Sequence, residues 1–210
     1  MKQTDNLKQF SFVSHGFCNC QDSSLVPAPI LMNQVHSADV LFLTERPNTP
    51  PAVDALITRT KGLCLTVKTA DCAPVLLVDK TSQMIAAIHA GWKGAFQGIL
   101  ENTVLQMVRH GSNLDTIYAG IGPHIQKNSF ICGKDMQSLF PVTEEKFFIQ
   151  EEGQTHFDFD AYVRYRLEKS GIQNIESITD DTYTNTDYFS YRRSPANPGR
   201  QYSFISIKEV

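Results

Sequence analysis

Short apolar runs, each bounded by polar residues, recur along this chain and predict a series of buried strands. Three of them follow one another closely: "LCLTV" (63–67), "PVLLVD" (74–79) and "MIAAIHA" (84–90). Runs of this length and composition are typical of strands that lie inside a sheet. The polar residues between the second and third runs predict a hairpin turn. Two later runs, "TIYAGIG" (116–122) and "QYSFISIK" (201–208), predict further strands.

A different period appears after Gly94 and predicts a helix. The residues that recur there at i, i+3, i+4 and i+7 are Phe96, Ile99, Leu100, Thr103, Val104, Met107 and Val108. This spacing places them on one face of an amphipathic helix, which we expect to end with Gly111 as its cap. A second helix is predicted over "DFDAYVRYRLEKSG" (158–171), which also ends in glycine.

These elements together predict the fold class. The Pro-rich "RPNTPPAVD" (46–54) predicts a surface loop, and no repeat or low-complexity tract divides the chain. We therefore expect a single α+β domain over residues 1–210, with layered mixed sheets covered by helices.

Composition and charge narrow the classes of partner. The 210 residues are 41% hydrophobic and carry a formal net charge of −3. This charge gives no basic footprint for nucleic acid, and no run of about 18 apolar residues predicts a membrane span. The polar start, "MKQTDNLKQF", lacks the apolar segment of a signal peptide, which favours a cytoplasmic location. We expect a small-molecule substrate, and a monomer or weak homodimer.

The cysteines are expected to be reduced thiols, because their number is odd and too small for a disulfide scaffold. They are Cys18, Cys20, Cys64, Cys72 and Cys132. We interpret the Cys-x-Cys pair near the start as a loop feature.

Two segments carry candidate anion-binding groups. "HAGWKG" (89–94) joins a predicted strand to the predicted helix, and the backbone N–H groups at Gly94 together with Lys93 favour phosphate or a carboxylate. A simple tight turn explains the glycines equally well. Arg192 and Arg193 of "SYRR" offer further anion contacts, or else form a solvated surface pair.

Three potential metal ligands stand at the ends of separate predicted strands. Taken singly, His36, Cys72 and His89 are each explained as structural residues. Together, two imidazoles and a thiolate match a catalytic zinc site, which has three protein ligands and an open fourth position. Their spacing matches no local zinc-finger pattern, so the site requires the strands to converge at one edge. Asp71, next to Cys72, is a candidate proton carrier or a turn-forming aspartate.

Six segments in order resemble the YfiH-like, laccase-domain family, whose members are also called polyphenol oxidase or purine nucleoside phosphorylase. They are "NQVHSADV", "VDALIT", "TADCAPVLL", "HAGWKG", "AGIGPHI" and "TNTDYFSYRR", and the match extends from Phe12 to the C-terminus. The resemblance implies a single α+β domain, related to layered folds of the cysteine-hydrolase type, and a catalytic zinc held by His36, Cys72 and His89. It also implies phosphorolysis of adenosine, inosine, guanosine-type nucleosides and methylthioadenosine, with inorganic phosphate as co-substrate, and deamination of adenosine.

The predicted site combines these candidates. Its members are the catalytic Cys72 and Asp71, the metal ligands His36, Cys72 and His89, and the phosphate or substrate contacts Lys93, Gly94, His124 and Arg192. His124 stands in "IGPHI" where the family commonly has cysteine, and its side chain is also able to bind metal. Lys93 stands where arginine is frequent, which keeps the positive charge but removes the bidentate fork.

Three other functions stay open on the same residues. A His, Cys, His set also suits copper, which would make the protein an oxidase. Without a metal, Cys72 as nucleophile and His89 as base would form a cysteine hydrolase. A protein that binds or edits cell-wall precursors would use the same pocket for another ligand.

Overall fold

Two strands at the centre of the molecule are buried on both faces. In the computed structural model, which describes residues 1–209, β6 (Ala73–Asp79) and β7 (Met84–Ala90) are buried along their whole length. Val75 and Leu77 of β6 pack into one apolar cluster, and Leu76 packs into another. Since successive side chains of a strand point to opposite faces, these strands require a covering layer on each side.

Strands β6 and β7 lie in the middle of a six-stranded mixed sheet with the order β12-β8-β6-β7-β4-β3. The other strands are β3 (Val40–Leu43), β4 (Ala55–Thr58), β8 (Ile117–Ile121) and β12 (Asn174–Ser177). The pairs β12–β8 and β3–β4 are parallel, and the remaining pairs are antiparallel. The predicted hairpin is confirmed, because β6 and β7 are antiparallel neighbours with Pro74 opposite His89.

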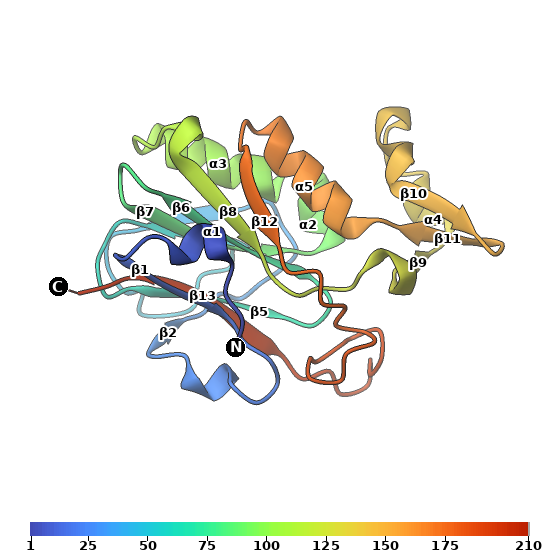
Figure 1. Cartoon of the computed structure of the whole chain (residues 1–210), viewed down its shortest axis with the longest axis horizontal. Coiled ribbons are helices and arrows are strands. Elements are labelled where there is room, and N and C mark those ends of the chain that lie inside the picture. Colours follow the sequence, from blue (N-terminus) through green and yellow to red (C-terminus); the bar gives the residue numbers. More distant parts are fainter. Residues whose placement is uncertain (210) are drawn as a thin grey trace.

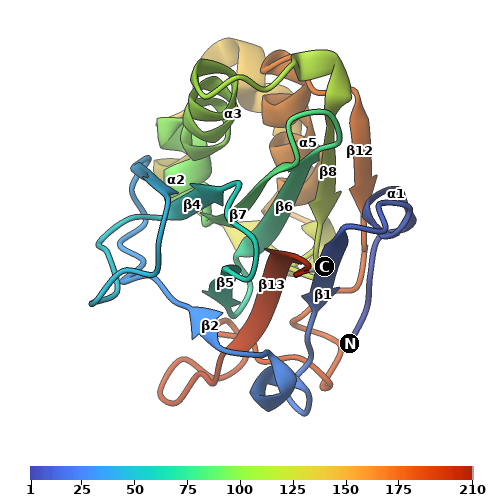
Figure 2. The same cartoon turned by 90° about the vertical axis from the view of Figure 1, so that its left-hand side faces the viewer.

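Helices cover one face of this sheet (Figures 1 and 2). They are α2 (Trp92–Gln97), α3 (Ile99–Arg109) and α5 (Phe159–Lys169). The prediction of one continuous helix through residues 96–108 is wrong, because Gly98, with a φ of 99°, ends α2 and precedes α3. Glycine adopts this left-handed conformation without a steric penalty, so the apolar period continues across a break in the helix. Gly111 and Gly171 follow α3 and α5 with φ values of 98° and 94°, as expected for caps.

A four-stranded sheet covers the opposite face, in the order β1-β13-β5-β2. Its strands are β1 (Val13–Phe17), β2 (Pro29–Ile30), β5 (Cys64–Thr69) and β13 (Gln201–Ile207), with the short α1 (Asp5–Lys8) beside β1. Leu65 and Val67 of β5 and Ile205 of β13 belong to the same apolar cluster as Leu76 of β6. The two sheets therefore enclose the second core.

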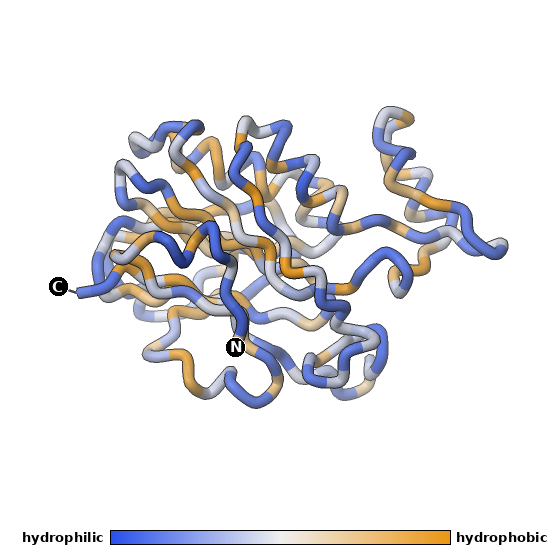
Figure 3. The backbone as a smooth tube through the Cα atoms, viewed as in Figure 1, coloured by the Kyte–Doolittle hydropathy of each residue, from blue (hydrophilic) through white to orange (hydrophobic). Residues whose placement is uncertain are grey.

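A third sheet of short strands projects from these layers, at the right of Figure 1. Its order is β10-β11-β9, with β9 (Ile131–Cys132), β10 (Phe148–Glu151) and β11 (Gln154–Phe157), and α4 (Lys134–Gln137) lies beside it. Figure 3 shows the most hydrophobic positions gathered along the strands of the stacked sheets. The expected α+β fold of layered mixed sheets and helices is confirmed. In residues 1–209, each helix is too short or too polar to cross a membrane.

Candidate metal centre and cavity

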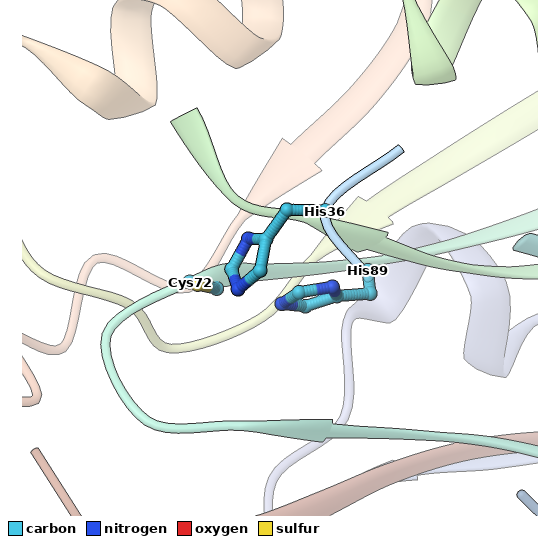
Figure 4. A group of neighbouring side chains, drawn as sticks. All are labelled: His36, Cys72 and His89. Atoms are coloured by element: carbon cyan, nitrogen blue, oxygen red, sulfur yellow. The ribbon is translucent and has the colours of Figure 1, made fainter. Parts of the chain in front are cut away.

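Three side chains that are distant in the sequence meet at one end of the β6–β7 hairpin (Figure 4). Cys72 directly precedes β6, His89 is the last but one residue of β7, and His36 lies in the loop between β2 and β3. One nitrogen of each imidazole and the Cys72 sulfur lie within 4.8 Å of one another. The predicted convergence is therefore present. His36 does not end a strand, however, and its loop backbone has a left-handed φ of 59°.

One buried carboxylate holds both histidines in place. Asp54 Oδ1 lies 2.8 Å from Nδ1 of His89 and accepts the backbone N–H of His36 at 3.1 Å. Asp54 Oδ2 accepts the N–H groups of Val35 and Ser37 at 3.2 and 2.7 Å. The Asp54 residue has no exposed surface. Because Nδ1 of His89 is bonded to this carboxylate, Nε2 is left to face a metal, which is the usual arrangement of a carboxylate behind a metal-binding histidine.

The pKa values of the two imidazoles are shifted in opposite directions. Burial lowers the pKa of His36, and repulsion from His89 lowers it further. Burial also acts to lower the pKa of His89, but the charge of Cys72 and the hydrogen bond with Asp54 outweigh burial and raise this pKa to about 9. For Asp54, burial acts to raise the pKa, while hydrogen bonds from His89 and Ser37 lower it to about 2. At neutral pH the raised pKa of His89 keeps a proton on its ring, so a bound cation would have to displace that proton, and the charges of Cys72 and Asp54 would then stabilise the cation instead.

Gly91 gives the metal-ligand side chains the space that they need. A Cβ built on Gly91 would lie 2.4 Å from Nδ1 of His36 and 3.3 Å from Sγ of Cys72. Within residues 1–209, no fourth His, Cys, Asp or Glu side chain joins this group. Two imidazole nitrogens and one thiolate fit zinc with an open fourth position.

The loop that carries His36 is also attached to β5. Gln34 Nε2 donates to the carbonyl oxygen of Lys68 at 2.7 Å, and the Lys68 N–H donates to Gln34 Oε1 at 2.8 Å. The side-chain amide thus makes the pair of hydrogen bonds that a neighbouring strand would make. The loop is therefore held at two places. Asp54 binds the N–H groups of residues 35–37, and the Gln34 side chain binds the backbone of β5.

The metal-ligand group lies on the wall of a cavity of about 1030 Å³. Its aromatic lining residues are Trp92, Phe130, Phe159 and Tyr191, and its cationic ones are Lys68, Lys93, Arg192 and Arg200. Among the described residues, none of these four cations forms an ion pair with a carboxylate. Aromatic faces together with unpaired positive charge suit a planar ligand that carries or accompanies an anion.

Two of the predicted phosphate or substrate contacts, Lys93 and Arg192, line this cavity. Gly94 does not, because α2 begins two residues earlier than expected and encloses it. A Cβ on Gly94 would lie 2.9 Å from the Ser37 carbonyl oxygen, so this glycine allows α2 to pack closely on the His36 loop. Gly94 stays in the first turn of α2, and the predicted anion contact at its N–H group stays a prediction.

His124 is also outside the cavity lining, although its sequence position suggested a place near the metal. It is completely buried, and its Nδ1 lies 2.8 Å from the Gly122 carbonyl oxygen. Its Nε2 lies 3.6 Å from a carboxylate oxygen of Asp160. The structure thus places His124 in a separate polar contact and not with His36, Cys72 and His89.

Asp71 lines the cavity, but its carboxylate points to the segment that follows β12. Oδ1 accepts a hydrogen bond from the Thr182 hydroxyl at 2.7 Å. Oδ2 accepts from the Ser190 hydroxyl at 3.0 Å and from the Arg192 N–H at 2.6 Å. The role of Asp71 as a proton carrier stays a prediction.

Sequence reasoning missed Asp54, Gly91 and Arg200. Asp54 opens "DALIT", directly before a fully buried strand, and an aspartate at such a position was the available signal. The sequence indicates Gly91 only as part of a turn. Nothing in the local sequence distinguishes Arg200 from a surface arginine, since its place depends on the start of β13 lying beside the end of β5.

Comparisons with known proteins identify the family of this chain. The sequence profile of the family described as multi-copper polyphenol oxidoreductase laccase matches residues 17–208. The chain is 37% identical over 186 residues to the purine nucleoside phosphorylase YfiH of Escherichia coli, covering 87% of this chain and 75% of that protein. It is 31% identical over 198 residues to adenosine deaminase RL5 from an unknown prokaryotic organism, covering 85% and 75%.

A solved structure shows the same architecture. The crystal structure of a Neisseria meningitidis protein superposes with a TM-score of 0.80 at 32% sequence identity. The superposition covers 90% of this chain and 78% of that one.

Proposed function

Because the chain belongs to the YfiH-like, multi-copper polyphenol oxidoreductase laccase family, we propose that it is a zinc-dependent enzyme that cleaves purine nucleosides with inorganic phosphate. The observation that carries this proposal is the convergence of His36, Cys72 and His89 beside a cavity that is also lined by lysine and arginine side chains. The relative named purine nucleoside phosphorylase YfiH supports the nucleoside substrate. The proposed substrates are adenosine, inosine, guanosine-type nucleosides and methylthioadenosine.

The cavity supplies groups for each part of the reaction. In phosphorolysis, a phosphate oxygen bonds to C1′ of the ribose while the C1′–N9 bond breaks and the base leaves with a proton. Lys93 and Arg192 provide positive charge for the phosphate, and Trp92 and Phe130 provide aromatic surface for the base. Zinc held by the His, Cys, His set would supply a Lewis acid beside these groups.

A second activity, hydrolytic deamination of adenosine, is supported by the relative named adenosine deaminase RL5. In this reaction water adds at C6 of the purine and ammonia leaves. The cavity and the metal ligands would be the same, so the two activities differ in whether phosphate or water reacts with the bound nucleoside.

Metal analysis and product analysis test the proposal together. Protein purified without chelator is expected to contain about one zinc per chain, and adenosine with phosphate is expected to give adenine and ribose-1-phosphate. Removing the Cys72 thiolate in Cys72→Ala should remove the zinc and lower turnover at least about a hundredfold, since a Lewis acid contributes several kcal/mol. Cys20→Ala, which removes a thiol outside the cavity, is the matched control and should keep both.

Other outcomes identify the competing functions. Inosine formed without phosphate would show deamination. Copper together with oxygen-dependent phenol oxidation and no nucleoside products would favour an oxidase. Nucleoside turnover that persists in metal-free Cys72→Ala would overturn the zinc proposal.

A further inference from the structure

The segment between β12 and β13 is irregular but firmly attached. In the described chain, residues 178–200 form no helix and no strand longer than a single bridge, which pairs Asp181 with His124. Arg193 binds this segment from within, since its guanidinium donates to the carbonyl oxygens of Thr182 and Tyr183 at 2.8 and 2.7 Å and also to that of Tyr188. Such a segment holds a defined shape through side-chain contacts rather than through backbone ladders.

Asp71, next to the metal-ligand candidate Cys72, joins this segment to the start of β6. Its three hydrogen bonds reach Thr182, Ser190 and the Arg192 N–H, at distances of 2.7, 3.0 and 2.6 Å. Only 9% of Asp71 is exposed, and its backbone φ of 80° is in the left-handed region. Hydrogen bonds to an ionised group are roughly twice as strong as neutral ones, and burial protects them from competition by water.

These contacts determine where two cavity residues lie. Arg192 and Tyr191 follow directly on Ser190, and both line the cavity. The Arg192 guanidinium lies over the Phe130 ring at 5.5 Å and donates to the Ile131 carbonyl oxygen at 2.9 Å. Among the described residues it has no carboxylate partner, so its charge stays available to an anion in the cavity.

The same contacts bear on the alternative role of Asp71. Both of its oxygens already accept hydrogen bonds from the segment, and a carboxylate that carried a proton to substrate would have to give up part of them. The geometry therefore favours attachment over proton transfer.

We infer that Asp71 is a positioning residue, whose carboxylate fixes residues 182–192 and thereby sets where Arg192 meets the anionic co-substrate. The effect on phosphate rests on the proposed phosphorolysis. The attachment of the segment does not, and hydrogen exchange measures it without any activity.

Two pairs of substitutions test the inference. Thr182→Val with Ser190→Ala leaves the Asp71 carboxylate in place but removes two of its three contacts. The matched control, Ser82→Ala with Thr116→Val, removes two hydroxyl contacts from Asp79, a buried aspartate at the far end of β6. Asp71→Asn, as a third variant, removes the acid itself.

Steady-state kinetics separate positioning from proton transfer. For Thr182→Val with Ser190→Ala, we expect KM for phosphate to rise roughly tenfold while kcat stays within about twofold of wild type. The control pair should leave both unchanged. A kcat loss in Asp71→Asn, combined with an unchanged KM for phosphate in the Thr182 and Ser190 variant, would overturn the inference and assign Asp71 to proton transfer.

Hydrogen exchange tests the attachment without any activity. Peptides covering 183–192 should exchange roughly tenfold faster in the Thr182 and Ser190 variant than in wild type or in the Asp79 control. Unchanged exchange there would overturn the inference. If no phosphate-dependent reaction occurs, the proposed function fails, while faster exchange still supports Asp71 as the residue that holds the segment.

Discussion

Each end of the β6–β7 hairpin has a buried aspartate that accepts three hydrogen bonds, but the two aspartates hold different parts of the molecule. At the turn, buried Asp79 accepts the Ser82 and Thr116 hydroxyls at 2.6 and 2.7 Å and the Thr81 N–H at 2.9 Å. At the metal end, Asp71 likewise accepts two hydroxyls and one backbone N–H.

The sequence distance between partners differs greatly between these ends. The partners of Asp79 lie 2, 3 and 37 residues away, whereas those of Asp71 lie 111, 119 and 121 residues away. Two of the three partners of Asp79 belong to its own turn, whereas all three partners of Asp71 belong to one distant segment that lines the cavity. Substitutions at the metal end should therefore change zinc affinity, whereas substitutions at the turn should change only the stability of the fold.

The largest effect is expected for Asp54→Asn at the metal end. Both oxygens of this carboxylate accept hydrogen bonds, from the N–H groups of residues 35–37 and from His89. If the amide NH₂ of asparagine faced the loop, it would meet other donors. If it faced His89, Nδ1 of His89 would have to accept, and Nε2 would then carry the proton and could not bind a metal. We expect zinc affinity, measured by chelator competition, to fall roughly 10- to 100-fold. The free energy of unfolding should fall by about 3 kcal/mol.

The same substitution at the turn, Asp79→Asn, is the matched control for that result. It should lower the free energy of unfolding at neutral pH by about 2 kcal/mol, because hydrogen bonds to an ionised acceptor are lost. Zinc affinity should not change. Equal losses of zinc affinity at both ends would show that the comparison between them is mistaken.

The pH dependence of Asp79 supplies a further check. Burial acts to raise the pKa of Asp79, but hydrogen bonds from Ser82 and Thr116 outweigh burial and lower it. A lowered folded-state pKa gives stability that is present above the unfolded value of about 3.9 and lost as the pH falls through the folded value. The stability difference between wild type and Asp79→Asn, measured by urea unfolding, should therefore shrink below about pH 4.

A smaller effect, confined to the metal end, is expected for Gly91→Ala. The added Cβ would lie 2.4 Å from Nδ1 of His36, but the backbone of Gly91 has an ordinary φ of −74°. The His36 ring has to move, so zinc affinity should fall by about tenfold while the melting temperature changes little. Unchanged zinc affinity would mean that His36 finds another way to reach the metal.

The smallest effect is expected at the turn, for Gln83→Gly. Gln83 has a left-handed φ of 52°, which glycine adopts without strain but with a greater loss of chain entropy. The net gain in the free energy of unfolding should be about 0.5 kcal/mol, measured by urea denaturation. Metal content and turnover should match wild type, and a loss of either would contradict the separation of the two ends.

Features that depend on local period were predictable from the sequence. The strand over 84–90 has the expected bounds, and α5 begins after Asp158, whose side chain accepts the Ala161 N–H as a cap. The three metal-ligand candidates were identified from their residue types and from the ordered motifs. The pairing of β6 with β7 places Cys72 near His89, whereas His36 reaches them from the loop between β2 and β3.

Features that depend on distant contacts were not predictable in the same way. Gly98 interrupts a helix whose apolar period continues unbroken, because a left-handed glycine changes the direction of the chain without changing the pattern. Asp54 and His89 are 35 residues apart in the sequence, and the hydrophobic period of the chain does not indicate that they form a hydrogen bond. His124 has a metal-binding side chain next to a site motif, but the fold directs it to Gly122 and Asp160.

The pairing of the Gln34 amide with Lys68 also covers a strand edge. Strand β2 covers β5 only at Cys64 and Leu65, so beyond these residues the edge of β5 would present free backbone groups. Exposed edges of this kind recruit strands from neighbouring molecules. Gln34 covers that edge at Lys68, because its side chain occupies both the N–H and the C=O of this residue. The loop that brings His36 to the metal centre therefore also covers part of an exposed strand edge.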